Sequence, residues 1–307
     1  MSSELISVII PTYNRAEMLR EAIESVLSQT YENFELLILD NCSPDHTPDV
    51  VASFNDARIK YLRHQCNIGA IANWAYGVHW AQGKYLSILG DDDKYKPEFL
   101  SRRVQAMTMA PNVVAAFGPF EFWYPEKGIT KISQSLKMQS SHECILEGYK
   151  CLYAAINIQF VGASLYDTCS VRSVWNKVIT GGQCGDSCLN ALLGMNKNYS
   201  MIYLECSDLL YRCHANQDMQ IGRYQVALDG GMVYTNLMQE APDNRSRKII
   251  KTALINHWNR YGRSCWESGD VLGARKYFLK EIAVSPFCLT TWGRIVRTYL
   301  NNEGRSK

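Results

Sequence analysis

Several features that would assign this chain to a familiar class are absent from its sequence. No apolar run approaches the roughly 18–20 residues that a membrane-spanning helix needs. The 11 cysteines form no CxxC pair, and Met1 to Glu4 do not resemble the start of a secretory signal. The net charge is only +2, which gives no global electrostatic case for nucleic acid. We therefore expect a protein of the reducing cytoplasm that would meet a membrane only peripherally.

Signatures of some enzyme classes are missing as well. The first turn, Pro11 to Asn14, lacks the GxGxxG pattern that lets backbone approach a pyrophosphate, which excludes a nicotinamide-dependent dehydrogenase. It also lacks the glycine- and lysine-rich loop expected of a nucleotidyltransferase. Cys184 and Cys188 have no matching Cys/His pair at zinc-finger spacing. We expect most cysteines to be small core residues.

Apolar segments and amphipathic helical segments alternate over the first 117 residues. The predicted strands are 5–10, 34–39, 58–62, 84–89 and 113–117. The predicted helices are 16–29, 47–54 (with Thr47 as N-cap), 70–81 and 97–109. Such alternation is typical of a parallel sheet with right-handed crossovers.

The pattern changes further along the chain. The predicted elements are a loop or hairpin at 120–142, a strand at 160–166, a flexible loop at 181–185, a helix capped by Asp186, and strands at 199–204 and 208–213. Beyond about residue 217 the pattern indicates only helices, including one helix–turn–helix unit of the tetratricopeptide kind. The last helix, around 292–300, either docks on its own core or presents a membrane-surface or partner face.

Three consecutive carboxylates, Asp91, Asp92 and Asp93, directly follow the predicted strand 84–89. Buried charges are costly without a counter-ion. Pro11, Asp40 and Asp91 all follow strand ends, so the topology should gather them at one edge of the sheet, where open α/β folds bind ligands. A divalent cation with an anionic substrate on its far side would explain the acids.

An ordered set of motifs resembles the family 2 glycosyltransferases, which have the GT-A fold. The set comprises Ser7 to Arg15, Leu39 to Asp45, Asn67-Ile68-Gly69 with Asn73-Trp74, Gly83-Lys84-Tyr85, and Leu89 to Asp93 with Pro97. The resemblance implies an α/β fold with a Rossmann-like, mostly parallel central sheet flanked by helices. It implies a catalytic domain over 1–216, with a nucleotide-sugar half at about 1–118 and an acceptor half at about 119–216, and a C-terminal helical extension over 217–307.

The resemblance also assigns donor-binding roles. Pro11, Thr12 and Tyr13 would line the base pocket, and Asn67 and Gly69 belong to the nucleotide-sugar motifs. Asp40 would accept a hydrogen bond from the base's imide N–H, which favours uracil or thymine because a carboxylate only accepts. A cap within its loop is the alternative role for Asp40. Asp91 would contact the donor ribose or a metal-bound water.

A metal site is implied next to these residues. Gly90 stands where the family carries the first aspartate of its acidic motif. Asp92 is then the expected ligand of Mn²⁺ or Mg²⁺, Asp93 a second ligand, and His214 a ligand or diphosphate partner. A surface histidine remains the alternative for His214. Arg212 is either a diphosphate partner or an ordinary exposed arginine.

The catalytic base is implied at Asp186, where the family's Glu-Asp pair reads Gly-Asp. It would deprotonate an acceptor hydroxyl in one inverting displacement, unless it is merely an N-cap. The expected activity is transfer from a nucleotide-sugar, favouring a UDP-sugar, to a glycan, lipid-linked or other hydroxyl acceptor in surface-polysaccharide or glycoconjugate synthesis, in the cytoplasm or at the inner membrane face. The alternative is a catalytically degenerate nucleotide-sugar-binding or scaffold protein.

Overall fold

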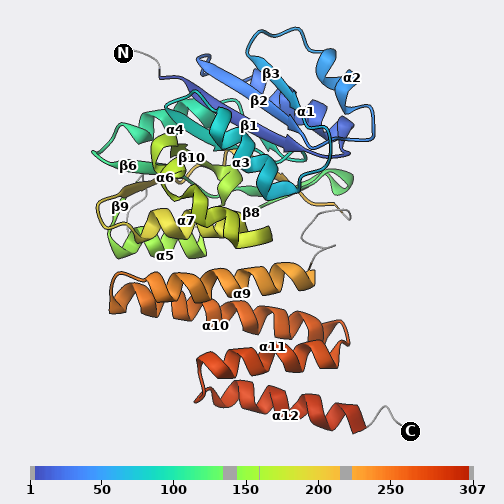
Figure 1. Ribbon diagram of the computed structural model, residues 1–307, viewed down its shortest axis with the longest axis vertical. Coiled ribbons are helices and arrows are strands. Elements are labelled where there is room, and N and C mark those ends of the chain that lie inside the picture. Colours follow the sequence, from blue (N-terminus) through green and yellow to red (C-terminus); the bar gives the residue numbers. More distant parts are fainter. Residues whose placement is uncertain (1–3, 134–143, 159, 215–222, 304–307) are drawn as a thin grey trace. The chain divides into compact units, whose positions relative to one another are not determined.

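The computed structural model describes residues 4–133, 144–158, 160–214 and 223–303, and the chain forms two compact units, 1–221 and 222–307 (Figure 1). The first unit is built around a large sheet with the strand order β3-β2-β1-β4-β10-β6-β11-β9. Its strands are β1 Ile6–Thr12, β2 Phe34–Asp40, β3 Ile59–Arg63, β4 Tyr85–Ile88, β6 Val113–Phe117, β9 Cys144–Glu147, β10 Ser164–Asp167 and β11 Ser200–Tyr203. The fold is therefore the α/β architecture that the sequence predicts.

The strands that carry the site pair in parallel. β1 lies between β2 and β4, and β2 also pairs with β3. β10 and β9 are antiparallel to their neighbours, while β11 runs parallel to β6. Nearly every residue of β1, β2 and β4 is buried, as expected of apolar strands covered by helices on both faces.

Helices of the first unit follow the strands. They are α1 Ala16–Leu27, α2 Thr47–Ala52, α3 Ala70–Trp80, α4 Phe99–Met107, α5 Tyr149–Asn157, α6 Thr168–Val178 and α7 Gly185–Met195. Short 3-10 helices are η1 Pro125–Lys127, η2 Val161–Ala163 and η3 Ile179–Cys184. Gly77 of α3 is required by close packing, since a Cβ there would lie 2.4 Å from the Leu39 side chain.

A second, smaller sheet has the order β5-β12-β7-β8. Its strands are β5 Lys94–Tyr95, β7 Glu121–Tyr124, β8 Ile129–Ile132 and β12 Leu209–Arg212. The sequence predicted either a loop or a hairpin at 120–142, and β7 and β8 form a hairpin there. Residues 134–142 of this segment lie outside the described residues. By pairing with β5, β12 comes directly beside the acidic segment that precedes β5.

Several local predictions are wrong. Residues 161–163 form η2, so only Ser164–Asp167 of the predicted strand 160–166 is extended. The predicted flexible loop 181–185 overlaps η3, and only Gly182, with φ +56°, departs from a helical backbone there. The N-cap of α2 is His46, one residue before Thr47, and α5 and α6 have no counterpart in the prediction. Capping and short helical turns depend on backbone geometry that apolar periodicity does not specify.

Over residues 223–303 the second unit contains helices only, as predicted for the chain beyond residue 217. They are α9 Arg223–Glu240, α10 Asn244–Glu267, α11 Val271–Val284 and α12 Leu289–Glu303. Consecutive helices pack against each other in this unit (Figure 1). Gly262 allows α10 to approach Phe278 of α11, because a Cβ there would lie 2.5 Å from the ring. Gly269 turns the chain between them at φ +82°.

The cysteines are mostly not core residues, contrary to the prediction. All 11 are free thiols, and only Cys151, Cys184 and Cys188 are buried. Free, dispersed thiols provide no disulfide framework for the fold. Among the described residues, no helix combines the length and the apolar character that crossing a membrane requires.

Candidate active site

The carboxyl ends of β1, β2 and β4 meet at one edge of the large sheet. Thr12 pairs with Asp40 in the register of β1 and β2, and the Asn41 N–H donates to the Thr12 carbonyl. The Thr12 hydroxyl donates to Asp91 Oδ2 at 2.8 Å. These contacts confirm that the topology gathers the ends of these strands, which come from distant parts of the sequence.

Asp91 is held by groups from the first turn of the chain. Besides Thr12, the Tyr13 N–H donates to it at 3.4 Å and Arg15 Nη1 donates at 2.9 Å. The side chain is buried, and burial raises the pKa of Asp91 to about 6 although the Arg15 charge opposes the rise. A carboxylate in this environment is stabilised by any further positive charge placed beside it.

Asp92 is joined to the second sheet by His214. Asp92 Oδ2 lies 3.0 Å from His214 Nε2 and 3.6 Å from Arg15 Nη1. His214 follows β12, 122 residues further along the chain than Asp92. The structure therefore places His214 within the acidic site, and the alternative of an unrelated surface histidine is wrong.

Asp93 is almost fully buried and is held by backbone. The Arg212 N–H donates to its Oδ1 at 2.9 Å. Burial, and secondly the negative charge of Asp92, raise the pKa of Asp93 well above its ordinary value. The Arg212 side chain donates to the Asp92 carbonyl and forms an ion pair with Glu21 at 2.9 Å. Arg212 is therefore not an ordinary exposed arginine, because its side chain is only 9% exposed.

The absence of a side chain at Gly90 leaves room for the carboxylates of Asp92 and Asp93. A Cβ at Gly90 would lie 2.9 Å from Asp92 Oδ1 and 3.0 Å from Asp93 Oδ2. Two hard oxygen donors thus face the same small region, which suits Mg²⁺ or Mn²⁺. In the part of the chain that the structure describes, no group of three or more His, Cys, Asp and Glu side chains forms a metal site. The donor chemistry fits a divalent cation that takes its other ligands from water or substrate.

Placing an aspartate at position 90, where the sequence resemblance expects one, should therefore destabilise the protein. Gly90→Asp adds a fourth carboxylate where Asp92 and Asp93 already converge, so we expect the free energy of unfolding to fall by about 1–3 kcal/mol. Thermal unfolding measures the loss. Gly293→Asp is the matched control, since nothing lies within 4 Å of a Cβ at Gly293. Equal stability of both variants would contradict the convergence of the two carboxylates.

Asp40 lies at the same edge but its oxygens are already bonded. The Ser43 N–H donates to Oδ1 at 2.7 Å, while the Tyr61 hydroxyl donates to Oδ2 at 2.5 Å. Arg63 Nε lies 3.3 Å from the same Oδ2, and Asp40 is 0% exposed. The loop-cap role is therefore present. Contact with a nucleobase stays a prediction, and because Asp40 is buried it requires a neighbouring side chain such as Tyr61 or Arg63 to move.

The other predicted donor-binding residues lie around this edge. Tyr13 is exposed, whereas Thr12 is buried and Pro11 is half-buried. Asn67 Oδ1 accepts from Asn41 Nδ2 and from the Gly69 N–H, both at 2.9 Å. This exposed loop is thus tied to the end of β2, and Gly69 has φ +84°, which favours glycine.

Asp186 lies in the first turn of α7, where Cys184 is the N-cap. The interpretation of Asp186 as the N-cap of that helix is therefore wrong. Burial raises the pKa of Asp186, while hydrogen bonds from Ser187 oppose the rise. The pKa of Tyr211 is raised by burial and then by the negative charges of Asp93, Asp92 and Asp186. Tyr211 is thus close enough to sense both Asp186 and the acidic cluster.

Arg15 is the site residue for which the sequence predicted no role. It bonds Asp91 and approaches Asp92, so it offsets the charge of the cluster from the α1 side. The signal in the sequence is a lone cation directly after the first strand and its turn. Its partner could not be identified, because Asp91 lies 76 residues away.

This architecture is the GT-A fold. The structure of Staphylococcus aureus TarS 1–349 in complex with UDP-GlcNAc superposes with a TM-score of 0.70 and 14% sequence identity. The match covers 96% of this chain and 89% of the TarS chain. The mannosyltransferase PcManGT from Pyrobaculum calidifontis, in complex with GDP-Man and Mn²⁺, matches 98% and 88% with a TM-score of 0.55 and 14% identity. At these identities the likeness concerns the fold.

The sequence comparisons identify the family. Residues 7–157 match the model for Glycosyl transferase family 2. Escherichia coli (strain K12) WcaA, whose name places it in colanic acid biosynthesis, is 37% identical over 115 residues, 36% of this chain and 41% of WcaA. The Escherichia coli glucosyltransferase WfgD is 34% identical over 121 residues, 39% of this chain and 47% of WfgD. Each match covers less than half of the relative's length. Residues 7–157 of the chain therefore match glycosyltransferase family 2.

Proposed function

We propose that the protein is an inverting glycosyltransferase that moves a sugar from a nucleotide diphosphate sugar to an acceptor hydroxyl. The observation that carries the proposal is the cluster of Asp91, Asp92 and Asp93 at the carboxyl edge of a GT-A sheet. Arg15 and His214 contact this cluster from two other elements. Such a site suits an anionic donor together with a divalent cation.

The proposed donor is a UDP-sugar. Support comes from TarS, which has been solved in complex with UDP-GlcNAc and with UDP, although PcManGT has been solved with GDP-Man. The exposed ring of Tyr13 offers a face for a nucleobase. In this proposal Pro11 and Thr12 line the base pocket, Asn67 and Gly69 shape its rim, and Asp40 accepts the imide N–H once Tyr61 or Arg63 gives way. Asp91 faces the ribose.

Asp92 and Asp93 would hold Mn²⁺ or Mg²⁺, with His214 completing the site or contacting the diphosphate. When bound, the cation would neutralise the negative charge that grows on the departing diphosphate. Arg15 and Arg212 would then maintain the charge balance around the carboxylates, whose burial is otherwise costly.

Asp186 is the proposed general base. It would remove the proton of the acceptor hydroxyl as that oxygen attacks the anomeric carbon, and the bond from this carbon to the diphosphate oxygen would break. One displacement inverts the anomeric centre, and the electron pair of the broken bond leaves with the nucleoside diphosphate. No second carboxylate nucleophile is needed.

The relatives support a proposal for the acceptor class and the cellular setting. The printed name of WfgD includes a diphosphoundecaprenol-linked acceptor, and that of WcaA refers to colanic acid biosynthesis. These names support surface-polysaccharide or glycoconjugate synthesis, with a glycan or lipid-linked acceptor. We place the protein in the cytoplasm, where peripheral contact with the inner membrane face is compatible with this role.

A screen of UDP-, GDP- and dTDP-sugars tests the proposal. We expect Mn²⁺-dependent release of UDP from at least one UDP-sugar, abolished by EDTA. Asp40→Ala should weaken donor binding if its carboxylate recognises the base. Donor binding without turnover, on any donor and with any acceptor, would favour the second candidate, a catalytically degenerate binding or scaffold protein, which Gly90 and Gly185 at usually acidic positions support.

The acid limb of the pH profile gives a separate prediction. Because burial raises the pKa of Asp186 and a base acts only when deprotonated, kcat/KM should rise with pH through a limb centred above the ordinary carboxyl value of about 4. The measurement is kcat/KM against pH at saturating Mn²⁺. If the acid limb of kcat/KM lay at the same pH in Asp186→Asn, the titration of another group would cause it.

A further inference from the structure

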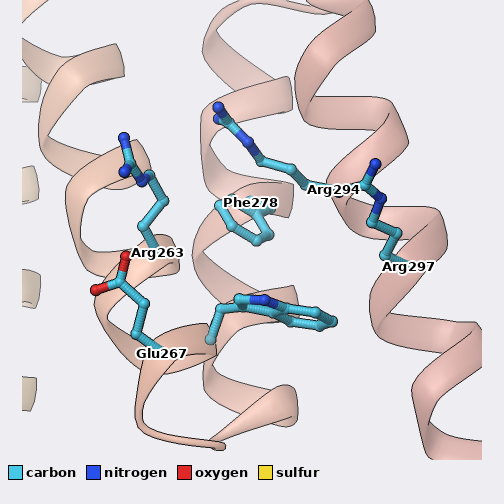
Figure 2. A pocket seen from close by; sticks show the side chains of 6 residues that line it. Arg263, Glu267, Phe278, Arg294 and Arg297 are labelled. Atoms are coloured by element: carbon cyan, nitrogen blue, oxygen red, sulfur yellow. The ribbon is translucent and has the colours of Figure 1, made fainter.

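A small pocket in the helical unit has a composition that the transfer site does not explain. It has a volume of about 160 Å³ and is lined by Arg263, Trp266 and Glu267 of α10, Phe278 of α11, and Arg294 and Arg297 of α12. Figure 2 shows Arg263 and Arg294 extending their guanidinium groups toward the same end of the pocket, beyond Phe278. Three helices therefore contribute to one concave site.

The charge of the pocket is unbalanced. Three of its six lining residues are arginines and only Glu267 is acidic. Among the described residues, no ion pair joins Arg263, Arg294 or Arg297 to a carboxylate. An anion bound between Arg263 and Arg294 would offset their positive charge, and guanidinium groups bind carboxylate and phosphate through paired hydrogen bonds.

The unit as a whole has the same bias. From Gly222 to Lys307 the sequence contains 14 Lys and Arg against 7 Asp and Glu, whereas the preceding 221 residues contain 18 against 23. The positive excess is thus confined to the helical unit, although the net charge of the chain is only +2. Local potentials of this kind attract anionic ligands.

Aromatic residues and the rim restrict the type of anion. Trp266 is partly exposed, whereas Phe278 is buried and lies 5.9 Å from the Arg294 guanidinium. A partly exposed indole offers a flat apolar face against which a ring can pack. The rim residues Arg263, Glu267 and Arg297 are charged and exposed, which favours a water-soluble ligand over lipid chains. The volume is below the roughly 300–1,000 Å³ of sites for drug-sized ligands, so it fits one small unit.

We propose that this pocket binds an acidic sugar unit, a sugar ring bearing a carboxylate or phosphate group. The arginines would bind the anionic group and Trp266 would pack against the ring. Such a unit would belong to an anionic acceptor glycan held outside the transfer site, so the biological role rests on the proposed transferase function. The binding itself does not depend on catalysis.

Calorimetric titration of the full chain, with UDP and Mn²⁺ present to occupy the transfer site, tests the pocket. The probes are glucuronic acid and glucose 1-phosphate, compared with glucose and inorganic phosphate. We expect both acidic sugars to bind more tightly than inorganic phosphate, and glucose not to bind. The double variant Arg294→Gln/Arg297→Gln should weaken binding of both acidic sugars at least tenfold. Trp266→Leu should make the acidic sugars bind no more tightly than inorganic phosphate.

The matched control is Lys248→Gln/Lys251→Gln, which removes the same charge from exposed positions of α10 outside the pocket and should leave binding unchanged. Equal weakening by both double variants, at equal thermal stability, would overturn the site. Binding of phosphatidylglycerol vesicles that depends on Arg294 and Arg297, without binding of either sugar, would assign the pocket to a membrane instead. UDP release from a UDP-sugar, assayed separately, shows whether the transferase proposal fails independently.

Discussion

Asp186→Asn should lower sugar transfer by about 100- to 10,000-fold while leaving donor binding intact. The range is the usual contribution of general acid–base catalysis, and asparagine keeps the shape of the side chain but cannot accept the proton. Donor binding should persist because the Asp186 side chain has no hydrogen bond or ion pair to Asp91, Asp92 or Asp93 among the described residues. The measurements are kcat with a competent acceptor and the Kd for UDP.

Asp49→Asn provides the control, since Asp49 also lies in the first turn of a helix, α2, but is exposed and outside the site. Its transfer rate should equal that of the wild type. If Asp186→Asn retained near-wild-type transfer, Asp186 would lose the role of base, and another carboxylate would have to be found for it.

Asp92→Asn is expected to have the second largest effect, a loss of roughly 100- to 1,000-fold in Mn²⁺-dependent UDP release. This corresponds to the several kcal/mol of charge stabilisation that a metal contributes as a Lewis acid. The variant should also need more Mn²⁺ for half-maximal activity, because an amide oxygen is a weaker ligand than a carboxylate. A titration of UDP release against Mn²⁺ measures both quantities.

For this variant the control is Asp56→Asn, which neutralises a carboxylate paired with Arg58 at 2.7 Å outside the site. It should not alter the Mn²⁺ requirement. An unchanged Mn²⁺ requirement in Asp92→Asn would show that the cation is held elsewhere, with Asp91 and Asp93 as the next candidates.

The part of the structure that could be predicted from the sequence is the part governed by long apolar segments. The apolar runs of β1, β2 and β4 were predicted within two residues at each end, because a strand buried on both faces must be apolar throughout. Parallel order then predicted, without any side-chain information, that Pro11, Asp40 and Asp91 lie together. The register of β1 and β2, which pairs Pro11 with Leu39 and Thr12 with Asp40, agrees.

Contacts that depend on register and on packing between distant elements could not be predicted. Tyr61 reaches Asp40 from β3, and Arg212 reaches Asp93 from β12, more than 100 residues further along. Neither contact leaves a periodic signal in the sequence. The same holds for α6, which begins after Asp167, whose side chain accepts from the Ser170 N–H. A single capping residue is a weak signal beside a long apolar run.

The burial of Asp40 changes what recognition of the donor base would require. The sequence offered two roles for Asp40, recognition of the base and a cap within its loop. The structure shows the cap, with contacts to Ser43, Tyr61 and Arg63. Because Asp40 is 0% exposed, recognition of an imide by its carboxylate requires a neighbouring side chain to move aside. Arg63, whose side chain is 43% exposed, is the partner that can move at least cost.

The most direct test of the account is a crystal structure with a UDP-sugar and Mn²⁺, in which anomalous scattering locates the ion. We predict that the ion is bound by Asp92 at the carboxyl edge of β1, β2 and β4, and that Asp186 faces the acceptor side of the sugar. An ion held by Asp91 and Asp93 with Asp92 turned away, or a sugar remote from Asp186, would contradict the account.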